Sequence, residues 1–113
     1  MTQEDKNLLL QDLCGRLPYG VVVVGVDDNK KPISTAYTLY NLDIRFPWTD
    51  CYAVLPYLRP ISSMTEEEED EYELVCRKSI TTQIDWLNKN MFDYRGLIPK
   101  GLANAALEGM YNS

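Results

Sequence analysis

Three consecutive residues, Asp93, Tyr94 and Arg95, form the polar group of this chain that is best suited to binding another molecule. A carboxylate next to an arginine can orient the guanidinium group, and arginine and tyrosine are common anchors of protein interfaces. Lys100 follows nearby, and Arg59 lies earlier in a proline-flanked segment. The same residues also fit a structural role, in which the tyrosine packs beneath a loop and each arginine pairs with a local carboxylate. Both interpretations remain open from the sequence.

A run of six acidic residues at positions 66–71 is the second candidate. Glu67, Glu68 and Glu71 could form a surface that binds a basic partner or that imitates a nucleic-acid backbone. The alternative is a solvated helix start, because the helix dipole favours negative charge in the first turns.

Catalytic and metal-binding patterns are missing from the sequence. The chain has no histidine, which removes the usual general base and the commonest transition-metal ligand. It has no glycine-rich phosphate loop and no nucleophile elbow. Three widely separated cysteines, Cys14, Cys51 and Cys76, predict neither a disulfide framework nor a zinc site, and we expect them to be reduced and mostly buried. We therefore expect no enzymatic activity, no cofactor and no metal ion.

Composition narrows the possible partners. The net charge of −6 argues against direct nucleic-acid binding and against adsorption to an anionic membrane. No apolar run is long enough to span a bilayer, and Leu8, Leu9 and Leu10 are too few for a signal peptide. We expect one domain over residues 1–113, located in the cytoplasm, with an unidentified protein as its partner.

The candidate residues lie on or around a long helical stretch at residues 61–94. Ser63 with Glu66, or Thr65 with Glu68, has the spacing of a capping box. Helical periodicity then predicts one buried stripe, made of Tyr72, Cys76, Ile80, Ile84, Leu87 and Met91. Residues 79–82 are poor helix formers, so the stretch is either one helix or two, with Thr82 as a possible cap of the second.

Shorter elements precede this stretch. Residues 2–14 predict a helix capped by Thr2, with Gly15 just past its end. The four valines within residues 20–26 predict a strand in the middle of a sheet, followed by a hairpin turn at 27–32. Further strands are predicted at residues 33–40, 42–46 and 51–55, with a turn at 47–50 and an aromatic patch or small core at Trp48 and Tyr52. The predicted fold is α+β, with a small antiparallel meander packed against the long C-terminal helix and the N-terminal helix beside it.

Residues beyond the long stretch should close the core. We expect Leu97 and Ile98 to be buried, residues 102–107 to form a short helical turn, and residues 108–113 to be frayed.

Three segments resemble a family of small uncharacterised proteins from gut bacteria and their mobile elements. These segments read DLCGRLPYGV at 12–21, LRPISSMTEEE at 58–68 and DWLNKNMFDYRGLIPKGLA at 85–103. The resemblance covers both ends of the chain but not residues 22–55. It implies no activity, because none is assigned to the family, so no residue inherits a catalytic role.

These observations predict a small non-enzymatic protein with an interaction or regulatory role, and the resemblance implies that a mobile element carries it. The alternative is an acidic inhibitor, or nucleic-acid mimic, that occupies a basic site on a nucleic-acid-handling protein.

Overall fold

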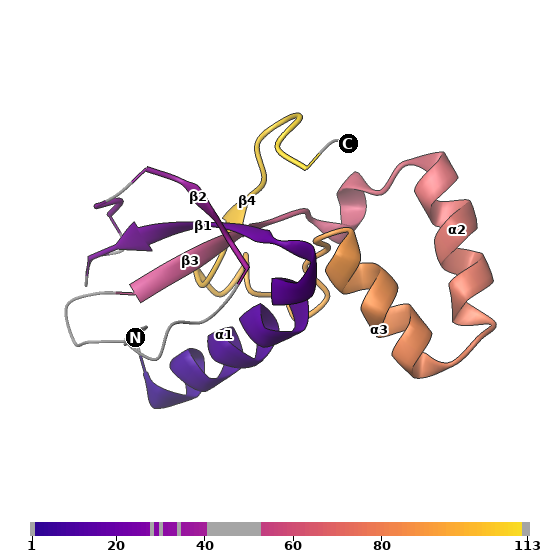
Figure 1. The fold of residues 1–113 in the computed structure, drawn as a ribbon, viewed down its shortest axis with the longest axis horizontal. Helices are drawn as coiled ribbons and strands as arrows, with labels where there is room; N and C mark the ends of the chain where they lie inside the picture. The colour runs from indigo at the N-terminus through magenta and orange to yellow at the C-terminus, as the bar shows by residue number, and fades with distance from the viewer. Residues whose placement is uncertain (1, 28, 30, 34, 41–52, 112–113) are drawn as a thin grey trace.

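The fold is α+β, as the sequence predicts. The computed structural model describes residues 2–27, 29, 31–33, 35–40 and 53–111 (Figure 1). In these residues it contains three α-helices and a four-stranded mixed sheet. The helices are α1 (Gln3–Arg16), α2 (Glu66–Cys76) and α3 (Ile80–Lys89), and the strands are β1 (Val21–Val26), β2 (Tyr37–Leu39), β3 (Ala53–Leu58) and β4 (Asn104–Ala105).

The sheet has the strand order β2-β1-β3-β4. Strand β1 is internal, and five of its six residues are buried, as expected for a continuous valine run. It pairs antiparallel with β2 and β3, whereas β3 and β4 are parallel. The predicted antiparallel meander is therefore wrong in two respects: β1 lies between β2 and β3, and the sheet is mixed.

The turn between β1 and β2 follows the predicted hairpin. Asp27 organises it, because one carboxylate oxygen accepts hydrogen bonds from the backbone N–H groups of Asn29 and Lys31, both at 2.9 Å. Strand β2 is shorter than the predicted strand at 33–40. The predictions for residues 42–46, for the 47–50 turn, for Cys51 and for the Trp48–Tyr52 patch lie outside the described residues.

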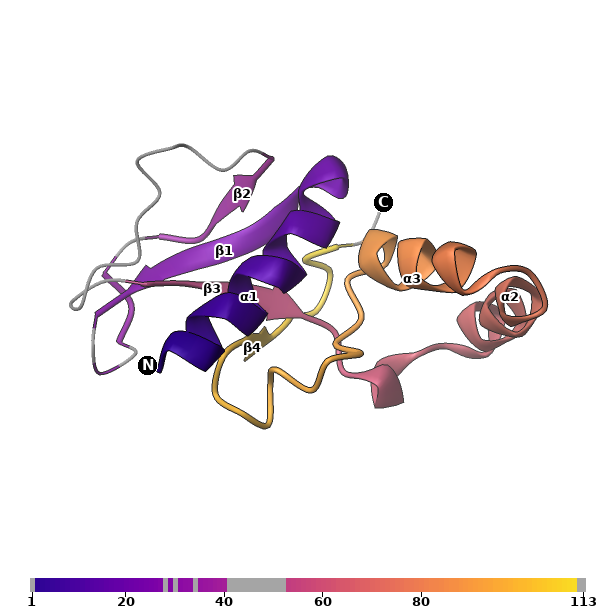
Figure 2. The ribbon, with the colours of Figure 1, turned by 90° about the horizontal axis from the view of Figure 1, so that it is seen from below.

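Helix α1 covers one face of the sheet (Figure 2). Thr2 and Asp5 form a capping box at its start, and Leu9 and Leu13 are fully buried against the strands. The helix continues through Gly15 to Arg16, so the predicted end at Gly15 is wrong. A Cβ atom at Gly15 would lie 2.9 Å from the side chain of Asn88, so the missing side chain allows α3 to approach α1 closely.

The stretch at 61–94 forms two helices rather than one. Thr65 and Glu68 form the capping box of α2, which confirms one of the two predicted starts. Helix α2 ends at Cys76, and Ser79 caps α3 by accepting a hydrogen bond from the backbone N–H of Thr82. The break lies at residues 77–79 and overlaps the predicted stretch at 79–82 only at Ser79, and the cap is Ser79 and not Thr82.

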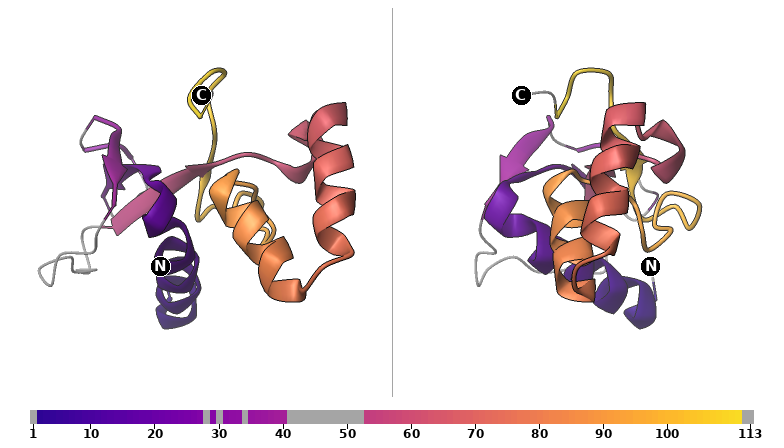
Figure 3. Two further views of the ribbon diagram at one scale, coloured as in Figure 1. Left: turned by 45° about the vertical axis from the view of Figure 1, so that its right-hand side comes forward. Right: turned by 90° about the vertical axis from the view of Figure 1, so that its right-hand side faces the viewer.

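The two helices form a hairpin that projects away from the sheet (Figure 3). Helix α2 has no buried residue, and α3 buries Leu87 and Asn88. The predicted packing of a long C-terminal helix on the sheet is therefore wrong, because α1 covers the sheet instead. The predicted buried stripe also fails in part, since Cys76, Ile80 and Ile84 are exposed.

The segment after α3 returns to the sheet. Leu97 is fully buried and Ile98 packs against the core, as predicted. The predicted helical turn at 102–107 is wrong, because β4 lies there and pairs with β3. Tyr111 is tied to the sheet: its hydroxyl accepts from the backbone N–H of Val22 at 3.0 Å and donates to the carbonyl of Tyr57 at 2.5 Å. The predicted fraying therefore does not begin at residue 108.

Candidate functional site

A buried ionic cluster joins α1 to the segment after α3. Asp12 accepts two hydrogen bonds from Arg16, at 2.8 and 3.0 Å, and one from Arg95 at 2.8 Å. Arg16 also donates to the backbone carbonyl of Phe92 at 2.6 Å. The side chains of Asp12 and Arg16 are fully buried, and that of Arg95 is 20% exposed. One carboxylate thus pairs with two guanidinium groups that come from opposite ends of the chain.

The ring of Tyr94 contacts both arginines of this cluster. The guanidinium carbon of Arg95 is 4.7 Å from the centre of the Tyr94 ring, and that of Arg16 is 5.4 Å from it. The Tyr94 hydroxyl donates a 3.0 Å hydrogen bond to the side chain of Asn88 on α3. These cation–π contacts add attraction where the arginines exceed the carboxylates in number.

Asp93 does not orient Arg95. Its two carboxylate oxygens accept hydrogen bonds from the backbone N–H groups of Leu97 and Ile98, at 2.8 and 2.9 Å, and close the turn that carries Leu97 into the core. The three consecutive candidates therefore separate: Asp93 holds a turn, whereas Tyr94 and Arg95 join the Asp12 cluster. These contacts fit the structural interpretation of the three residues.

A second ion pair connects the sheet to α2. Arg59, just after β3, donates to both carboxylate oxygens of Glu68 at 2.6 and 2.7 Å. Its guanidinium carbon is 4.3 Å from the centre of the Phe92 ring. These hydrogen bonds lower the pKa of the Glu68 carboxyl to about 2, and burial opposes the shift. Glu68 also caps α2, so a single carboxylate starts the helix and anchors it to the body.

Aromatic rings also attach the hairpin of α2 and α3 to the rest of the protein. The ring centres of Tyr72 on α2 and Trp86 on α3 are 5.4 Å apart, and those of Trp86 and Phe92 are 5.6 Å apart. Burial is the main cause that raises the pKa of Tyr72 above its ordinary value. The inner side of α2 therefore carries Tyr72 and Glu68, which together fix how the helix is rotated.

The acidic residues at positions 66–71 differ in their surroundings. Glu68 points toward Arg59, whereas Glu67 and Glu71 are exposed, as are Glu66, Glu69 and Asp70. Leu74 is 60% exposed and lies one turn after Glu71, on the side away from Tyr72. Sequence reasoning missed this leucine as a candidate because it lies off the predicted apolar stripe. Of the acidic candidates, Glu67 and Glu71 remain available to a partner.

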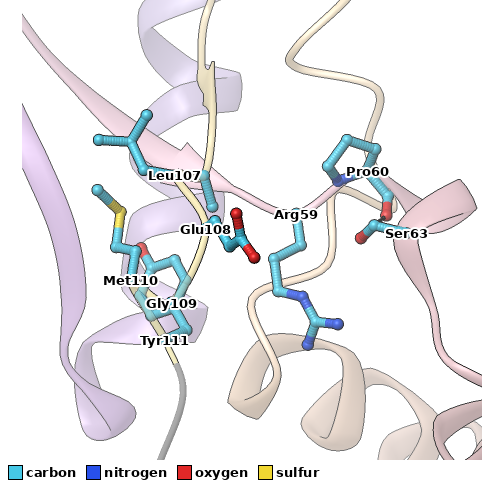
Figure 4. Close-up of a pocket in the computed structure, with 9 residues that line it drawn as sticks. Arg59, Pro60, Ser63, Leu107, Glu108, Gly109, Met110 and Tyr111 are labelled. Carbon is cyan, nitrogen blue, oxygen red and sulfur yellow. Dashed lines mark hydrogen bonds between the residues drawn. The ribbon is translucent and has the colours of Figure 1, made fainter.

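A cavity of about 280 Å³ lies beside Arg59. Its walls are Arg59, Pro60 and Ser63 on one side and residues 106–111 on the other (Figure 4). The guanidinium group of Arg59 contacts Glu68 on α2 and lies over the ring of Phe92. The volume is slightly below that of typical ligand pockets. The cavity supports no chemical assignment.

The described residues show no arrangement for metal binding or membrane crossing. No group of three or more cysteine, aspartate or glutamate side chains in this part of the chain could hold a metal ion. Among the same residues, no helix is long and apolar enough to span a bilayer. Cys14 and Cys76 are free thiols on the surface, so the prediction that the cysteines are mostly buried is wrong for these two.

Comparisons with protein-family models, with curated proteins and with solved structures found no match to this chain.

Proposed function

We propose that this protein is a non-enzymatic interaction module, and that the hairpin of α2 and α3 is the element that docks on a partner protein. The observation that carries the proposal is the exposure of large apolar side chains on a projecting element. Helix α2 buries no residue, and Leu74, Ile80 and Ile84 are 60%, 67% and 38% exposed. Exposed apolar residues gathered on one element are typical of surfaces that another protein covers.

The attachment of the hairpin supports a docking role. The bidentate Arg59–Glu68 pair and the Tyr72–Trp86–Phe92 rings fix the base and the inner side of the hairpin. The outer side of α2 and the start of α3 remain in solvent. A fixed element binds at a lower entropic cost than a segment that must first order itself.

The candidate residues of the sequence divide between structural and docking roles in this proposal. Asp93, Tyr94, Arg95 and Arg59 hold the body together, and Glu67 and Glu71 belong to the docking surface. We also propose a cytoplasmic location, a regulatory role carried by a mobile element, and membership of the family of small gut-bacterial proteins that the end segments resemble.

A second candidate function is the acidic inhibitor. The exposure of Glu67, Asp70 and Glu71 beside Leu74 favours it, because these carboxylates could enter a basic site of a nucleic-acid-handling protein. Association of this kind would be fast and strongly weakened by salt, since exposed charges are screened beyond about 10 Å at 0.1 M ionic strength.

The test is capture of partner proteins from the native host by the tagged chain, followed by mass spectrometry. The Leu74→Asp, Ile80→Asp double variant should lose a partner that the unchanged protein captures. Ile33→Asp is the matched control, because Ile33 is 55% exposed and lies outside the hairpin. Equal capture by all three proteins would reject the hairpin as the docking element.

Replacing Glu67 and Glu71 with glutamine distinguishes the two candidate functions. The acidic inhibitor predicts loss of capture by Glu67→Gln, Glu71→Gln, whereas apolar docking predicts that most of the capture remains. Glu68 is left unchanged in this variant because it caps α2 and binds Arg59.

A further inference from the structure

The outer face of α2 has charges of opposite sign at its two ends. Leu74 lies at the centre of this face and is 60% exposed. Asp70 and Glu71 precede it by four and three residues, and Arg77 and Lys78 follow it by three and four, so all four flank the leucine on the helix surface. All four are exposed. The face is therefore acidic, then apolar, then basic along the chain.

Helix α2 cannot turn this face toward its own body. On the opposite side, Tyr72 packs on Trp86 with ring centres 5.4 Å apart, and Glu68 forms the bidentate pair with Arg59. Arg77 remains in helical conformation as the C-terminal cap of α2, and Lys78 follows it just past the helix, where its backbone N–H bonds to the carbonyl of Val75. The acidic and basic ends thus point outward together.

We propose that a second copy of this chain docks on this face, with the two α2 helices antiparallel and Leu74 against Leu74 on the two-fold axis. An antiparallel pair centred on Leu74 sets Arg77 of each copy beside Asp70 of the other, and Lys78 beside Glu71, because residues seven positions apart share one side of a helix. A two-fold axis repeats each contact, so the pair forms four charge contacts around one apolar contact. The proposal rests on the proposed docking role of the hairpin and names its partner.

Charge complementarity favours a second copy over a basic partner. A uniformly basic helix would meet Asp70 and Glu71 favourably but would place like charges against Arg77 and Lys78. The required partner face must instead be basic, then apolar, then acidic in the opposite direction, and this chain supplies that pattern itself. The ion pair of Arg77 with Glu73 within one chain does not compete strongly with a contact of Arg77 to the second copy. Its two side chains are 71% and 66% exposed, and an exposed ion pair contributes little free energy.

The small size of this face limits the affinity of the dimer. Helix α2 has 11 residues, so the contact is short. A contact of this length is smaller than the roughly 1,200 Å² of total area at which specific stable interfaces begin. We therefore expect a reversible dimer with a dissociation constant on the order of 0.1 mM.

Sedimentation equilibrium over about 10 µM to about 1 mM of the full chain tests the proposal. The unchanged protein should pass from monomer to dimer over this range. Arg77→Glu places a glutamate opposite Asp70 and should raise the dissociation constant about tenfold or more. The double variant Asp70→Arg, Arg77→Glu exchanges the two charges of this pair and should return the dissociation constant toward that of the unchanged protein. Lys100→Glu is the control, because it makes the same change in net charge at an exposed position outside α2.

Three results would overturn the proposal. One is a monomer at every concentration, and another is a dimer that Leu74→Asp does not weaken. The third is equal weakening by Arg77→Glu and Lys100→Glu, which would reflect net charge and not the α2 face. A monomeric chain that still loses a captured host partner on Leu74→Asp, Ile80→Asp substitution would refute self-docking and leave the proposed function standing. Circular dichroism of each variant checks that α2 is still helical.

Discussion

Replacing Asp12 with asparagine removes the carboxylate that contacts both Arg16 and Arg95. The substitution preserves side-chain size, so its effect reports the lost charge and not a cavity. Asp12 and Arg16 are fully buried, and Asp12 accepts three hydrogen bonds of 2.8 to 3.0 Å. Arg16 Nη1 has no hydrogen-bond partner among the described residues, so this guanidinium group already depends on Asp12 for its stabilisation.

The size of the effect follows from the burial of both groups. Removing one partner of a buried ion pair costs about 3–5 kcal/mol, because the other charge is left uncompensated away from water. Arg95 adds little to this cost, since its side chain is 20% exposed and can recover water. Small domains are stable by about 5–15 kcal/mol, so Asp12→Asn should remove a large share of the free energy of unfolding.

Urea denaturation followed by far-ultraviolet circular dichroism measures the loss. With an m-value of about 1–2 kcal/mol per molar urea, the midpoint should fall by roughly 2 M or more. Glu73→Gln is the matched control, because it removes a carboxylate from the exposed Arg77 pair and should change stability by less than about 1 kcal/mol. Equal midpoint shifts for the two variants would refute the assignment of Asp12 as the counter-charge of the cluster.

Three further predictions concern other contacts. The lowered pKa of Glu68 means that its contribution to stability is present above pH 4.5 and is lost as the pH falls toward 2. The difference in stability between the unchanged protein and Glu68→Gln should therefore shrink over that pH range. In an NMR titration, Arg59→Gln should raise the pKa of Glu68. Tyr111→Phe removes the hydroxyl that bonds to two backbone groups and should cost about 1–2 kcal/mol in the same urea assay, whereas no change would mean that this residue does not tie the C-terminal segment to the sheet. Cys14 and Cys76 are exposed, so both thiols should react rapidly with a thiol reagent in the native protein, and slow labelling of either would contradict its surface position.

Features set by neighbouring residues could be predicted from the sequence. The Thr2–Asp5 and Thr65–Glu68 caps depend on side chains three positions apart, and both form. The valine run of β1 becomes the internal strand because consecutive β-branched residues suit a strand with both faces buried. The poor helix formers at 79–82 predict a break close to the one observed at residues 77–79, because Ser79 suits the cap of a new helix.

Features set by contacts between distant segments could not be predicted. Arg95 meets Asp12 across 83 positions, and no local pattern announces that pair. Strand β4 has two residues, too few for an alternating pattern, and it forms because β3 offers an open edge. The Asp12–Arg16 spacing in α1 did carry a signal, since acid and base four positions apart share a helix face.

The predicted stripe at 72–91 failed because periodicity holds only within one helix. Residues 77–79 separate α2 from α3 and reset the rotation, so Tyr72 and Ile80 no longer share a face. Tyr72 turns inward to Trp86, while Ile80 is 67% exposed. The break that interrupts the predicted buried stripe also produces the projecting hairpin of α2 and α3.

The candidate docking surface therefore depends on contacts outside it. An isolated helix shorter than about 12–15 residues is marginal in water, and α2 has 11 residues and buries none of them. Its order must come from the Thr65 cap, the Arg59–Glu68 pair and the packing of Tyr72 on Trp86. Arg59 reaches α2 from the end of β3, so the sheet positions the hairpin through one guanidinium group. A partner that covers Leu74 would stabilise the helical state of α2. Every contact that already orders α2 would in turn raise the affinity for that partner, because less ordering remains to be done on binding.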